Sequence, residues 1–355
     1  MKILTTTLHA IDNCGSCLQA YALQQHLLSL GHQNEIIDYR PDYARNNGNP
    51  LKNFIKSIVF HKQMKERWRV FDTFVKEHLI LTSQTFSSYE EVKRSNLEAD
   101  VFVTGSDQVW NDYFPCGRDP VYYLSFTDKK KISYAASVGR SLTESAGLDT
   151  LCDKIRDFDA VSVREKNTPA ELAKKGISAT WVCDPTLLHK KDFYEKIMHS
   201  KETVEYLLVY LTEKSELLDE VIRKYREEKN GKVIYVGSFL NRCDCDVNYT
   251  DVGPREFVGL IANASMVIAG SYHALLFSCI FQKEFVILPY KNNARMEQFL
   301  DYIECKKRYL SDGVNENTLE TIEWQMINDK IDELVDKSKD WLNNRLYEDG
   351  TETND

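Results

Sequence analysis

The sequence contains no apolar run of the roughly 18 to 20 residues that a membrane-spanning helix needs. Its first residues, Met1 to Thr5, are too few and turn polar too soon to form a signal peptide. We therefore expect a cytoplasmic protein that does not span a membrane. A peripheral association with a membrane stays open.

An excess of basic residues is missing as well. The chain has 45 lysines and arginines against 54 aspartates and glutamates, which gives a formal net charge of −9. A general nucleic-acid-binding protein needs a large surplus of cations for phosphate backbones, so this class is excluded. A local basic pocket for a small anion remains compatible with the composition.

The cysteine pattern lacks the features of a disulfide scaffold or a zinc site. Nine cysteines form an odd count scattered over a long chain, which favours free thiols. Cys14 and Cys17 have C-x-x-C spacing, and Cys243 and Cys245 have C-x-C spacing, but neither pair has a second His/Cys pair at zinc-finger distance. A redox role for Cys14 and Cys17 stays open because they precede a predicted helix, although no thioredoxin-like context surrounds them.

Apolar runs alternate with helix-periodic stretches in both halves of the chain, and 43% of the residues are apolar. A length of 355 residues indicates two domains of ordinary size. We therefore expect an α/β fold with two doubly wound domains that face each other across a cleft. The expected units are an N-terminal domain at 1–190, a C-terminal domain at 191–318, a helix at 319–347 and a flexible tail at 348–355. Whether the helix packs back across the two domains stays open.

The first candidate binding loop precedes a helix predicted at 17–30. Gly15 would let the backbone approach a ligand closely, and Asn13 and Ser16 supply hydrogen-bonding side chains. The loop is not a complete G-x-G-x-x-G fingerprint. A tight turn with a capping serine explains it equally well.

A second small and polar loop, 105–111, follows the strand predicted at 99–104. Asp107, Gln108 and Asn111 could select sugar hydroxyls or position a proton, and Trp110 could pack on a ring. The alternative is a helix cap with a buried tryptophan.

Arg164 directly follows the strand predicted at 160–163. An arginine at the carboxyl end of a strand is well placed for a carboxylate or phosphate, whose geometry suits a bidentate guanidinium. A surface ion pair with Glu165 is the alternative.

The clearest strand–loop–helix pattern lies in the second half of the chain. An apolar strand at 266–269 stops at Gly270, and Ser271 offers a helix N-cap ahead of an apolar-rich run. This places His273 at the carboxyl edge of a sheet, where amide N–H groups favour anions. His273 could donate to a phosphate or move a proton, or it could simply cap or pack. Lys291 and Arg295 follow the next predicted strand, 284–288, and add two cations.

Six segments together resemble the polysaccharide pyruvyl transferase family, in the order typical of that family. The resemblance implies two Rossmann-like domains in a glycosyltransferase B-like arrangement, and transfer of the pyruvate skeleton from phosphoenolpyruvate to a sugar as a cyclic ketal. The segments are NCGSCLQAYAL at 13–23, VTGSDQVWN at 103–111, YAASVG at 134–139, SVRE at 162–165, VCDPTLL at 182–188 and SYHALLFS at 271–278.

By position, Arg164 and His273 match the arginine and histidine of the family, and Lys291 lies where a donor-binding lysine is expected. One departure is Tyr272, because many members carry an arginine just before the histidine. The second cation is therefore either missing or supplied by Lys291 or Arg295. His273 is expected to act as general acid or to bind phosphate only, and Asp107 is a candidate base. No metal is required, since Arg164 and Lys291 can stabilise charge.

The sequence thus predicts a transferase that uses phosphoenolpyruvate as donor substrate, without a further cofactor. The expected acceptor is a nucleotide- or lipid-linked sugar in surface polysaccharide synthesis, such as that of a capsule or exopolysaccharide. A sugar-nucleotide-dependent glycosyltransferase and a non-catalytic sugar- or nucleotide-binding module are the two alternatives. The oligomeric state stays open.

Overall fold

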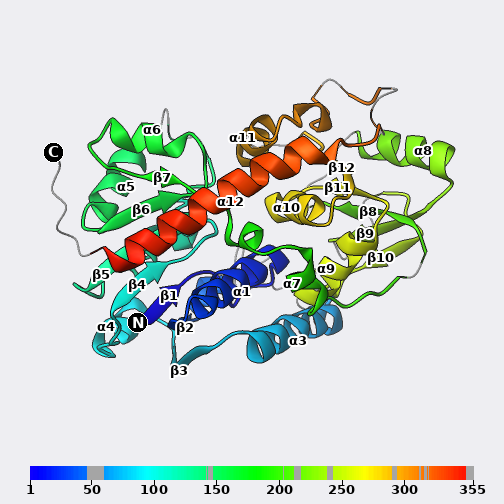
Figure 1. The fold of residues 1–355 in the computed structure, drawn as a ribbon. Helices are drawn as coiled ribbons and strands as arrows, with labels where there is room; N and C mark the ends of the chain where they lie inside the picture. Colours follow the sequence, from blue (N-terminus) through cyan, green and yellow to red (C-terminus); the bar gives the residue numbers. More distant parts are fainter. Residues whose placement is uncertain are drawn as a thin grey trace.

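The computed structural model describes residues 1–45, 60–140, 142, 147–202, 204–211, 217–237, 243–289, 294–311, 313–315, 318 and 320–348 (Figure 1). Lys291 and the chain after Glu348 lie outside these residues, so the predictions made for them stay predictions.

The N-terminal domain is built on a sheet of seven strands in the order β3-β2-β1-β4-β5-β6-β7, and every neighbouring pair is parallel. Parallel strands need crossover connections, which the helices of this half supply. Its elements are β1 (Lys2–Thr6), α1 (Cys14–Ser29), β2 (Gln33–Tyr39), η1 (Asp42–Ala44), α3 (His61–His78), β3 (Leu81–Phe86), α4 (Tyr89–Arg94), β4 (Val101–Thr104), η2 (Pro115–Arg118), η3 (Pro120–Tyr123), β5 (Lys130–Ala136), α5 (Gly147–Ile155), β6 (Ala160–Val163), α6 (Thr168–Ala173), β7 (Thr180–Trp181) and η4 (Pro185–Leu188).

The C-terminal domain has a smaller sheet of five strands in the order β10-β9-β8-β11-β12, again with parallel pairs. The predicted α/β class with two Rossmann-like domains is therefore confirmed. Its elements are α7 (Lys191–Glu195), β8 (Tyr206–Tyr210), α8 (Leu218–Lys229), β9 (Lys232–Val236), β10 (Val247–Tyr249), α9 (Pro254–Asn263), β11 (Met266–Ala269), α10 (Tyr272–Ile280), β12 (Glu284–Val286), α11 (Ala294–Tyr302) and η5 (Lys306–Arg308).

Each sheet has one point at which the strand order reverses. In the N-terminal domain it lies between β1 and β4, and in the C-terminal domain between β8 and β11. In open α/β sheets, ligands bind outside the carboxyl ends of the strands at such a switch point. All residues of β4 and β11 are buried, which explains why both read as short apolar runs in the sequence.

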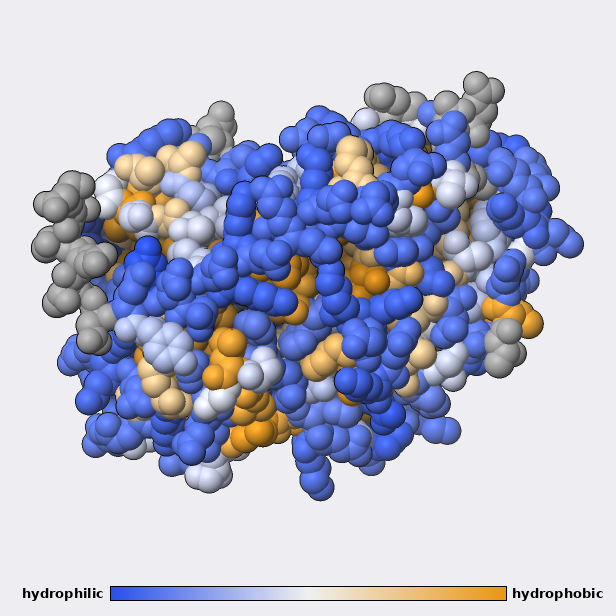
Figure 2. Space-filling view, viewed as in Figure 1, coloured by the Kyte–Doolittle hydropathy of each residue, from blue (hydrophilic) through white to orange (hydrophobic). Residues whose placement is uncertain are grey.

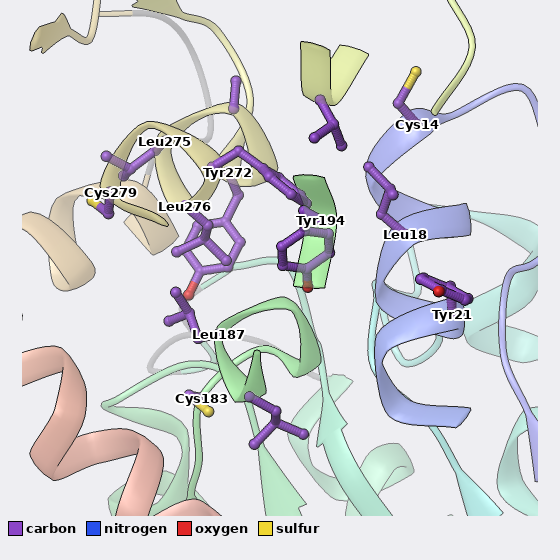
Figure 3. Close-up of a cluster of buried hydrophobic side chains, with 14 of the residues drawn as sticks. Cys14, Leu18, Tyr21, Cys183, Leu187, Tyr194, Tyr272, Leu275, Leu276 and Cys279 are labelled. Carbon is purple, nitrogen blue, oxygen red and sulfur yellow. The ribbon is translucent and has the colours of Figure 1, made fainter. Parts of the chain in front are cut away.

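The two domains share one apolar cluster at their boundary (Figure 3). Tyr21 of α1 stacks on Phe193 with ring centroids 5.2 Å apart, and Tyr194 contacts the ring of Phe277 of α10 at 4.8 Å. Helix α7, which carries Phe193 and Tyr194, therefore packs against both domains. Burial of this apolar surface stabilises the boundary.

A long helix, α12 (Trp324–Tyr347), crosses both domains on one face of the molecule (Figure 1). Near its start, the Tyr302 hydroxyl donates to the Lys330 carbonyl at 2.8 Å. Further along, the Cys183 N–H donates to Ser338 Oγ at 2.8 Å, and near the end Lys130 Nζ donates to the Leu346 carbonyl at 3.3 Å.

The face that carries α12 is mostly hydrophilic, with apolar surface in patches beside the helix (Figure 2). The helix starts later than the predicted position 319. In the part of the chain that the structure describes, no helix combines the length and the apolar character required to cross a bilayer.

One predicted boundary was wrong in a way that affects the site. Helix α1 begins at Cys14, earlier than the predicted Cys17, because Asn13 caps it by accepting a hydrogen bond from the Ser16 N–H at 3.2 Å. Ser16 therefore lies in the first helical turn and is not the cap. Arg295 follows the strand, as predicted, and lies in the first turn of α11.

Candidate active site

Residues that follow four different strands meet at the boundary between the domains. Asp107 follows β4, Arg164 follows β6 and Asp184 follows β7, while His273 follows β11 of the other domain. The carboxyl ends of parallel strands lie at one edge of a sheet, so this meeting point results from the topology. Asp107 and His273 each follow a strand that lies at the switch point of its sheet.

The centre of the site is a buried ion pair between Arg164 and Asp184. Arg164 Nη1 donates to Asp184 Oδ2 at 2.7 Å, and both side chains are at most 1% exposed. Asp184 Oδ1 accepts from the backbone N–H of Thr186 at 3.0 Å and from its hydroxyl at 2.8 Å. The sequence analysis assigned no role to Asp184, although it is a polar residue at a strand end and precedes a proline.

His273 reaches this ion pair from the C-terminal domain. Its Nε2 lies 3.3 Å from Asp184 Oδ2, within ion-pair distance, but it makes no hydrogen bond with any described residue. Ser271 caps α10 by accepting from the Ala274 N–H at 3.1 Å, as its position after the strand predicts. The capped helix holds His273 in its first turn.

Gly15 of the N-terminal domain lies against the imidazole of His273. A Cβ atom on Gly15 would collide with Nδ1 and Cγ of His273 and lie 2.8 Å from its Cβ. The missing side chain thus makes room for the histidine of the other domain. The sequence analysis expected it to make room for a ligand.

Two arginines lie against the ring of Tyr272. The guanidinium carbon of Arg164 is 5.0 Å from the ring centroid, and that of Arg295 is 5.8 Å away. Cation–π attraction favours both positions. Burial lowers the pKa of Arg295, and the charge of Arg164 lowers it further. Arg295 therefore supplies a second cation beside Tyr272, the position at which the sequence analysis noted that a cation is missing.

Several buried nitrogens of this cluster have no hydrogen-bond acceptor among the described residues. They are Nε and Nη2 of Arg164, Nε of Arg295 and Nε2 of His273. Arg164 Nη2 lies 3.7 Å from Asp107 Oδ1, close enough for ion-pair attraction only. Leaving a buried donor unpaired costs free energy, so this arrangement suits an anion that supplies acceptors.

The charges of the cluster stabilise one another. Burial favours the neutral form of the Asp184 carboxyl, but the charges of His273 and Arg164 outweigh it and hold the pKa of Asp184 well below its ordinary value. Burial likewise opposes the charge on Arg164, yet the carboxylates of Asp184 and Asp107 raise its pKa. Burial raises the pKa of the Tyr272 hydroxyl, which is therefore neutral near pH 7.

The alternative of a surface pair between Arg164 and Glu165 is wrong, because both residues are buried. Glu165 instead accepts hydrogen bonds from the backbone N–H groups of Val138 and Gly139, each at 3.2 Å. It thereby fixes the loop that follows β5.

Asp107 lies in an irregular loop, with a left-handed φ of 76°. Its Oδ1 accepts from the Gln108 N–H at 2.8 Å, and its Oδ2 accepts from the Ser16 hydroxyl. Asn111 Nδ2 donates to Gln108 Oε1 at 2.7 Å. The hypothesis that Trp110 packs on a ligand ring is wrong, because Trp110 is buried and its Nε1 donates to the Tyr122 carbonyl at 3.1 Å.

A cavity of about 190 Å³ opens beside Asp107 at the switch point of the N-terminal sheet. Asn13, Ser16, Asp107 and Gln108 of the predicted set line it, whereas Arg164 and His273 do not and belong to the ion cluster, in which Arg164 Nη2 lies 3.7 Å from Asp107 Oδ1. Its lining residues are Leu8, Ile11, Asn13, Ser16, Tyr43, Ala44, Asp107, Gln108, Phe114, Pro115 and Cys116.

The predicted absence of a metal site stays a prediction. Across the described ranges, no three side chains of His, Cys, Asp or Glu are grouped so that they could hold a metal ion. All nine cysteines have free thiols, and burial raises the pKa of Cys14 to about 12, which disfavours its reactive thiolate.

The fold and the site define an α/β protein of two Rossmann-like domains with a buried cluster of arginine, histidine and carboxylate side chains between them. The chain is similar in structure to the UDP-GlcNAc 2-epimerase of Methanocaldococcus jannaschii, with a TM-score of 0.50, 11% identity and coverage of 95% and 93% of the two chains. It is also similar to a candidate UDP-N-acetylglucosamine 2-epimerase of Listeria monocytogenes, with a TM-score of 0.51, 10% identity and coverage of 99% and 93%. At such low identity the likeness shows the shared fold alone.

The chain belongs to the polysaccharide pyruvyl transferase family, whose family model matches residues 13–292. It is therefore a transferase, and the resemblance noted in the sequence is confirmed. The matched segment includes Asn13 and His273 and stops shortly before Arg295. No curated protein matches the sequence.

Proposed function

We propose that the protein is a ketal-forming pyruvyl transferase that moves the pyruvate skeleton from phosphoenolpyruvate to two hydroxyls of a nucleotide- or lipid-linked sugar. We assign this reaction to surface polysaccharide synthesis. The observation that carries the proposal is the set of buried side-chain nitrogens on Arg164, Arg295 and His273 that have no hydrogen-bond partner among the described residues. Phosphoenolpyruvate is a small molecule with two anionic groups, and it would supply acceptors to all three residues.

In this proposal Arg164 and Arg295 bind the carboxylate and the phosphate of the donor. Arg295 replaces the arginine that many family members carry just before the histidine, and Tyr272 supports both guanidinium groups through its ring. The donor pocket thus keeps two cations although the local sequence pattern has lost one. Lys291 remains a further candidate for donor binding.

The residues also account for the chemistry. Protonation of C3 of the enol by His273 makes a methyl group and an electrophilic C2, which one sugar hydroxyl attacks. The C2–O bond to phosphate breaks, and the second hydroxyl closes the ketal. Of the two hydroxyl protons, one replaces the proton given by His273 and the other leaves with phosphate. Asp184 stabilises the protonated imidazole, and Asp107 accepts a hydroxyl proton.

The test is acceptor-dependent release of phosphate from phosphoenolpyruvate, measured with His273→Asn and Arg295→Gln. We expect His273→Asn to lower kcat by about 100-fold or more, because a general acid contributes that much. Arg295→Gln should chiefly raise the KM for phosphoenolpyruvate. The matched control is His199→Asn, since His199 pairs with Glu256 at 3.1 Å and its side chain is 60% exposed.

Three results would contradict the proposal. Consumption of a sugar nucleotide without release of phosphate from phosphoenolpyruvate would identify a glycosyltransferase. Binding of a sugar or nucleotide without turnover of either donor would identify a non-catalytic module. Unchanged kinetics of both variants would show that the donor binds elsewhere.

A further inference from the structure

We propose that the cavity beside Asp107 is the acceptor subsite and that it binds one neutral pyranose ring, with the reacting hydroxyls directed at Asp107. This inference rests on the proposed function, because it assumes a donor bound at the cluster of Arg164, Arg295 and His273. It adds the place of the acceptor, its size and its charge.

The size of the cavity limits what it can hold. Its volume of about 190 Å³ lies below the range of roughly 300–1,000 Å³ for sites that take drug-sized ligands. One sugar ring is a ligand of this smaller size, whereas a disaccharide or a nucleotide is not. The remainder of a longer acceptor must therefore extend out past the rim.

The polarity of the walls matches a sugar. The polar groups, Asn13, Ser16, Asp107 and Gln108, come from the start of α1 and the loop after β4, and the Ser16 hydroxyl donates to Asp107. Apolar side chains such as Leu8, Ile11 and Phe114 complete the lining. A pyranose presents hydroxyls at its edge and C–H groups on its faces, and it fits such a division.

The charge of the walls excludes an acidic sugar. Asp107 is the one charged side chain among the described residues that line the cavity. A uronic acid would place its carboxylate in a small cavity with another carboxylate and without a cation among the described lining residues. Like charges held close together repel each other. A neutral hexose or N-acetylhexosamine avoids this cost.

Asp107 connects the cavity to the donor cluster. It lines the cavity, its Oδ2 accepts from Ser16, and its Oδ1 faces Arg164 Nη2 at 3.7 Å. A hydroxyl that donates to Asp107 from the cavity therefore lies next to the residue that would hold the donor. This proximity is what a transfer between two bound substrates requires.

Phe114 lies where the remainder of a longer acceptor would extend out of the cavity. It lines the cavity and is also 45% exposed, so its ring reaches from the inside to the rim. An exposed aromatic ring offers an apolar surface to the C–H face of a sugar. The neighbouring Tyr113 is 65% exposed and does not line the cavity.

The experiment compares Ala44→Phe, which fills the cavity, and Phe114→Ala with the matched control Tyr113→Ala. Acceptors are the methyl glycosides of glucose, galactose, mannose and N-acetylglucosamine, together with methyl glucuronide and methyl galacturonide. Phosphate release gives the KM for the acceptor, and calorimetry gives the Kd for phosphoenolpyruvate.

We expect Ala44→Phe to raise the acceptor KM about tenfold or more and Phe114→Ala to raise it by about threefold, while the Kd for phosphoenolpyruvate is unchanged. Tyr113→Ala should match the wild type. Each uronide should be used at least about tenfold less efficiently than its neutral counterpart.

The outcomes separate this inference from the proposed function. If the wild type does not bind phosphoenolpyruvate, the proposed function fails and the inference fails with it. If it binds phosphoenolpyruvate but Ala44→Phe leaves the acceptor KM unchanged, uronides react as well as neutral glycosides, or no neutral glycoside reacts, the acceptor inference alone is overturned.

Discussion

Arg164 and Arg308 are both buried arginines paired with a carboxylate, yet they use their nitrogens differently. Arg308 donates from Nη1 to the Thr318 carbonyl at 3.4 Å and from Nη2 to Glu284 at 3.3 Å, so both terminal nitrogens have acceptors and only its Nε lacks one among the described residues. Arg164 donates hydrogen bonds from Nη1 alone in the described part of the chain, and its Nη2 has only the ion-pair contact with Asp107 at 3.7 Å.

This difference separates a structural arginine from a binding one. Arg308 ties the segment ahead of α12 to β12, and its hydrogen bonds are made within one domain. Arg164 keeps half of its guanidinium facing a site that two domains share. A buried charge with unpaired donors costs stability, and a bound anion would offset that cost.

The largest effect should come from Arg164→Ala compared with Arg308→Ala. Removal of Arg164 leaves the carboxylate of Asp184 buried without its partner, which should cost about 3–5 kcal/mol of unfolding free energy. Arg308→Ala should cost less, since the Glu284 side chain is 27% exposed. Urea unfolding measures both costs.

Calorimetry with phosphoenolpyruvate then tests the comparison itself. We expect binding to be lost in Arg164→Ala and kept in folded Arg308→Ala. Equal loss of binding in the two variants would mean that unpaired nitrogens do not mark the binding arginine.

The second effect concerns pH and the carboxylate that pairs with Arg164. Because the pKa of Asp184 is lowered in the folded protein, its contribution is fully present above its ordinary pKa of 3.8 and is lost as pH falls towards the lower folded value. Asp184→Asn should therefore be less stable than the wild type at pH 7 by about 2–3 kcal/mol, and this difference should shrink below pH 4 or so. Urea unfolding over this pH range measures it.

Asp38→Asn is the matched control for this prediction. The pKa of Asp38 is also lowered, since hydrogen bonds from His9 and Arg40 outweigh burial, but Asp38 lies outside the ion cluster. Its variant should show the same trend with pH and retain binding of phosphoenolpyruvate. If Asp184→Asn also retained full binding of phosphoenolpyruvate, the Asp184 carboxylate would not contribute to the binding site.

The smallest effect should come from Gly15→Ala. The added methyl group pushes on His273 across the domain boundary, and overpacking of this kind costs about 1–3 kcal/mol. We expect kcat/KM for phosphoenolpyruvate to fall by about tenfold, because the methyl group displaces His273 from the cluster around Arg164. The hydrogen bonds of Arg308 lie within one domain and should not change. Phosphate release measures the fall.

Gly259→Ala controls for crowding alone. Its methyl group would collide with the His199 carbonyl oxygen, away from the cluster. It should lower stability and leave the KM for phosphoenolpyruvate unchanged. If both glycine variants changed catalysis alike, contact with His273 would not be the cause.

Local signals in the sequence predicted the elements that carry the site. The strands at 160–163 and 266–269 have the predicted bounds, because a short apolar run that stops at a polar residue or a glycine defines each of them. Arg164 and His273 could be selected because each directly follows such a strand.

The rest of the site depends on contacts between distant parts of the chain. The sequence contains no local sign that Gly15 packs on His273, or that Asp184 lies between Arg164 and His273, since these contacts form only when the domains meet. Arg295 was selected as a cation, but its place beside Tyr272 follows from the start of α11, which the sequence pattern did not reveal.

Helix α12 has a consequence for how the protein forms during synthesis. Ser338 and Leu346 accept hydrogen bonds from Cys183 and Lys130, so parts of the first domain obtain their partners only after the second domain has been translated. Domains generally fold in order as they leave the ribosome. The first domain therefore lacks these two contacts, at Lys130 of β5 and at Cys183 after β7, until α12 has been synthesised.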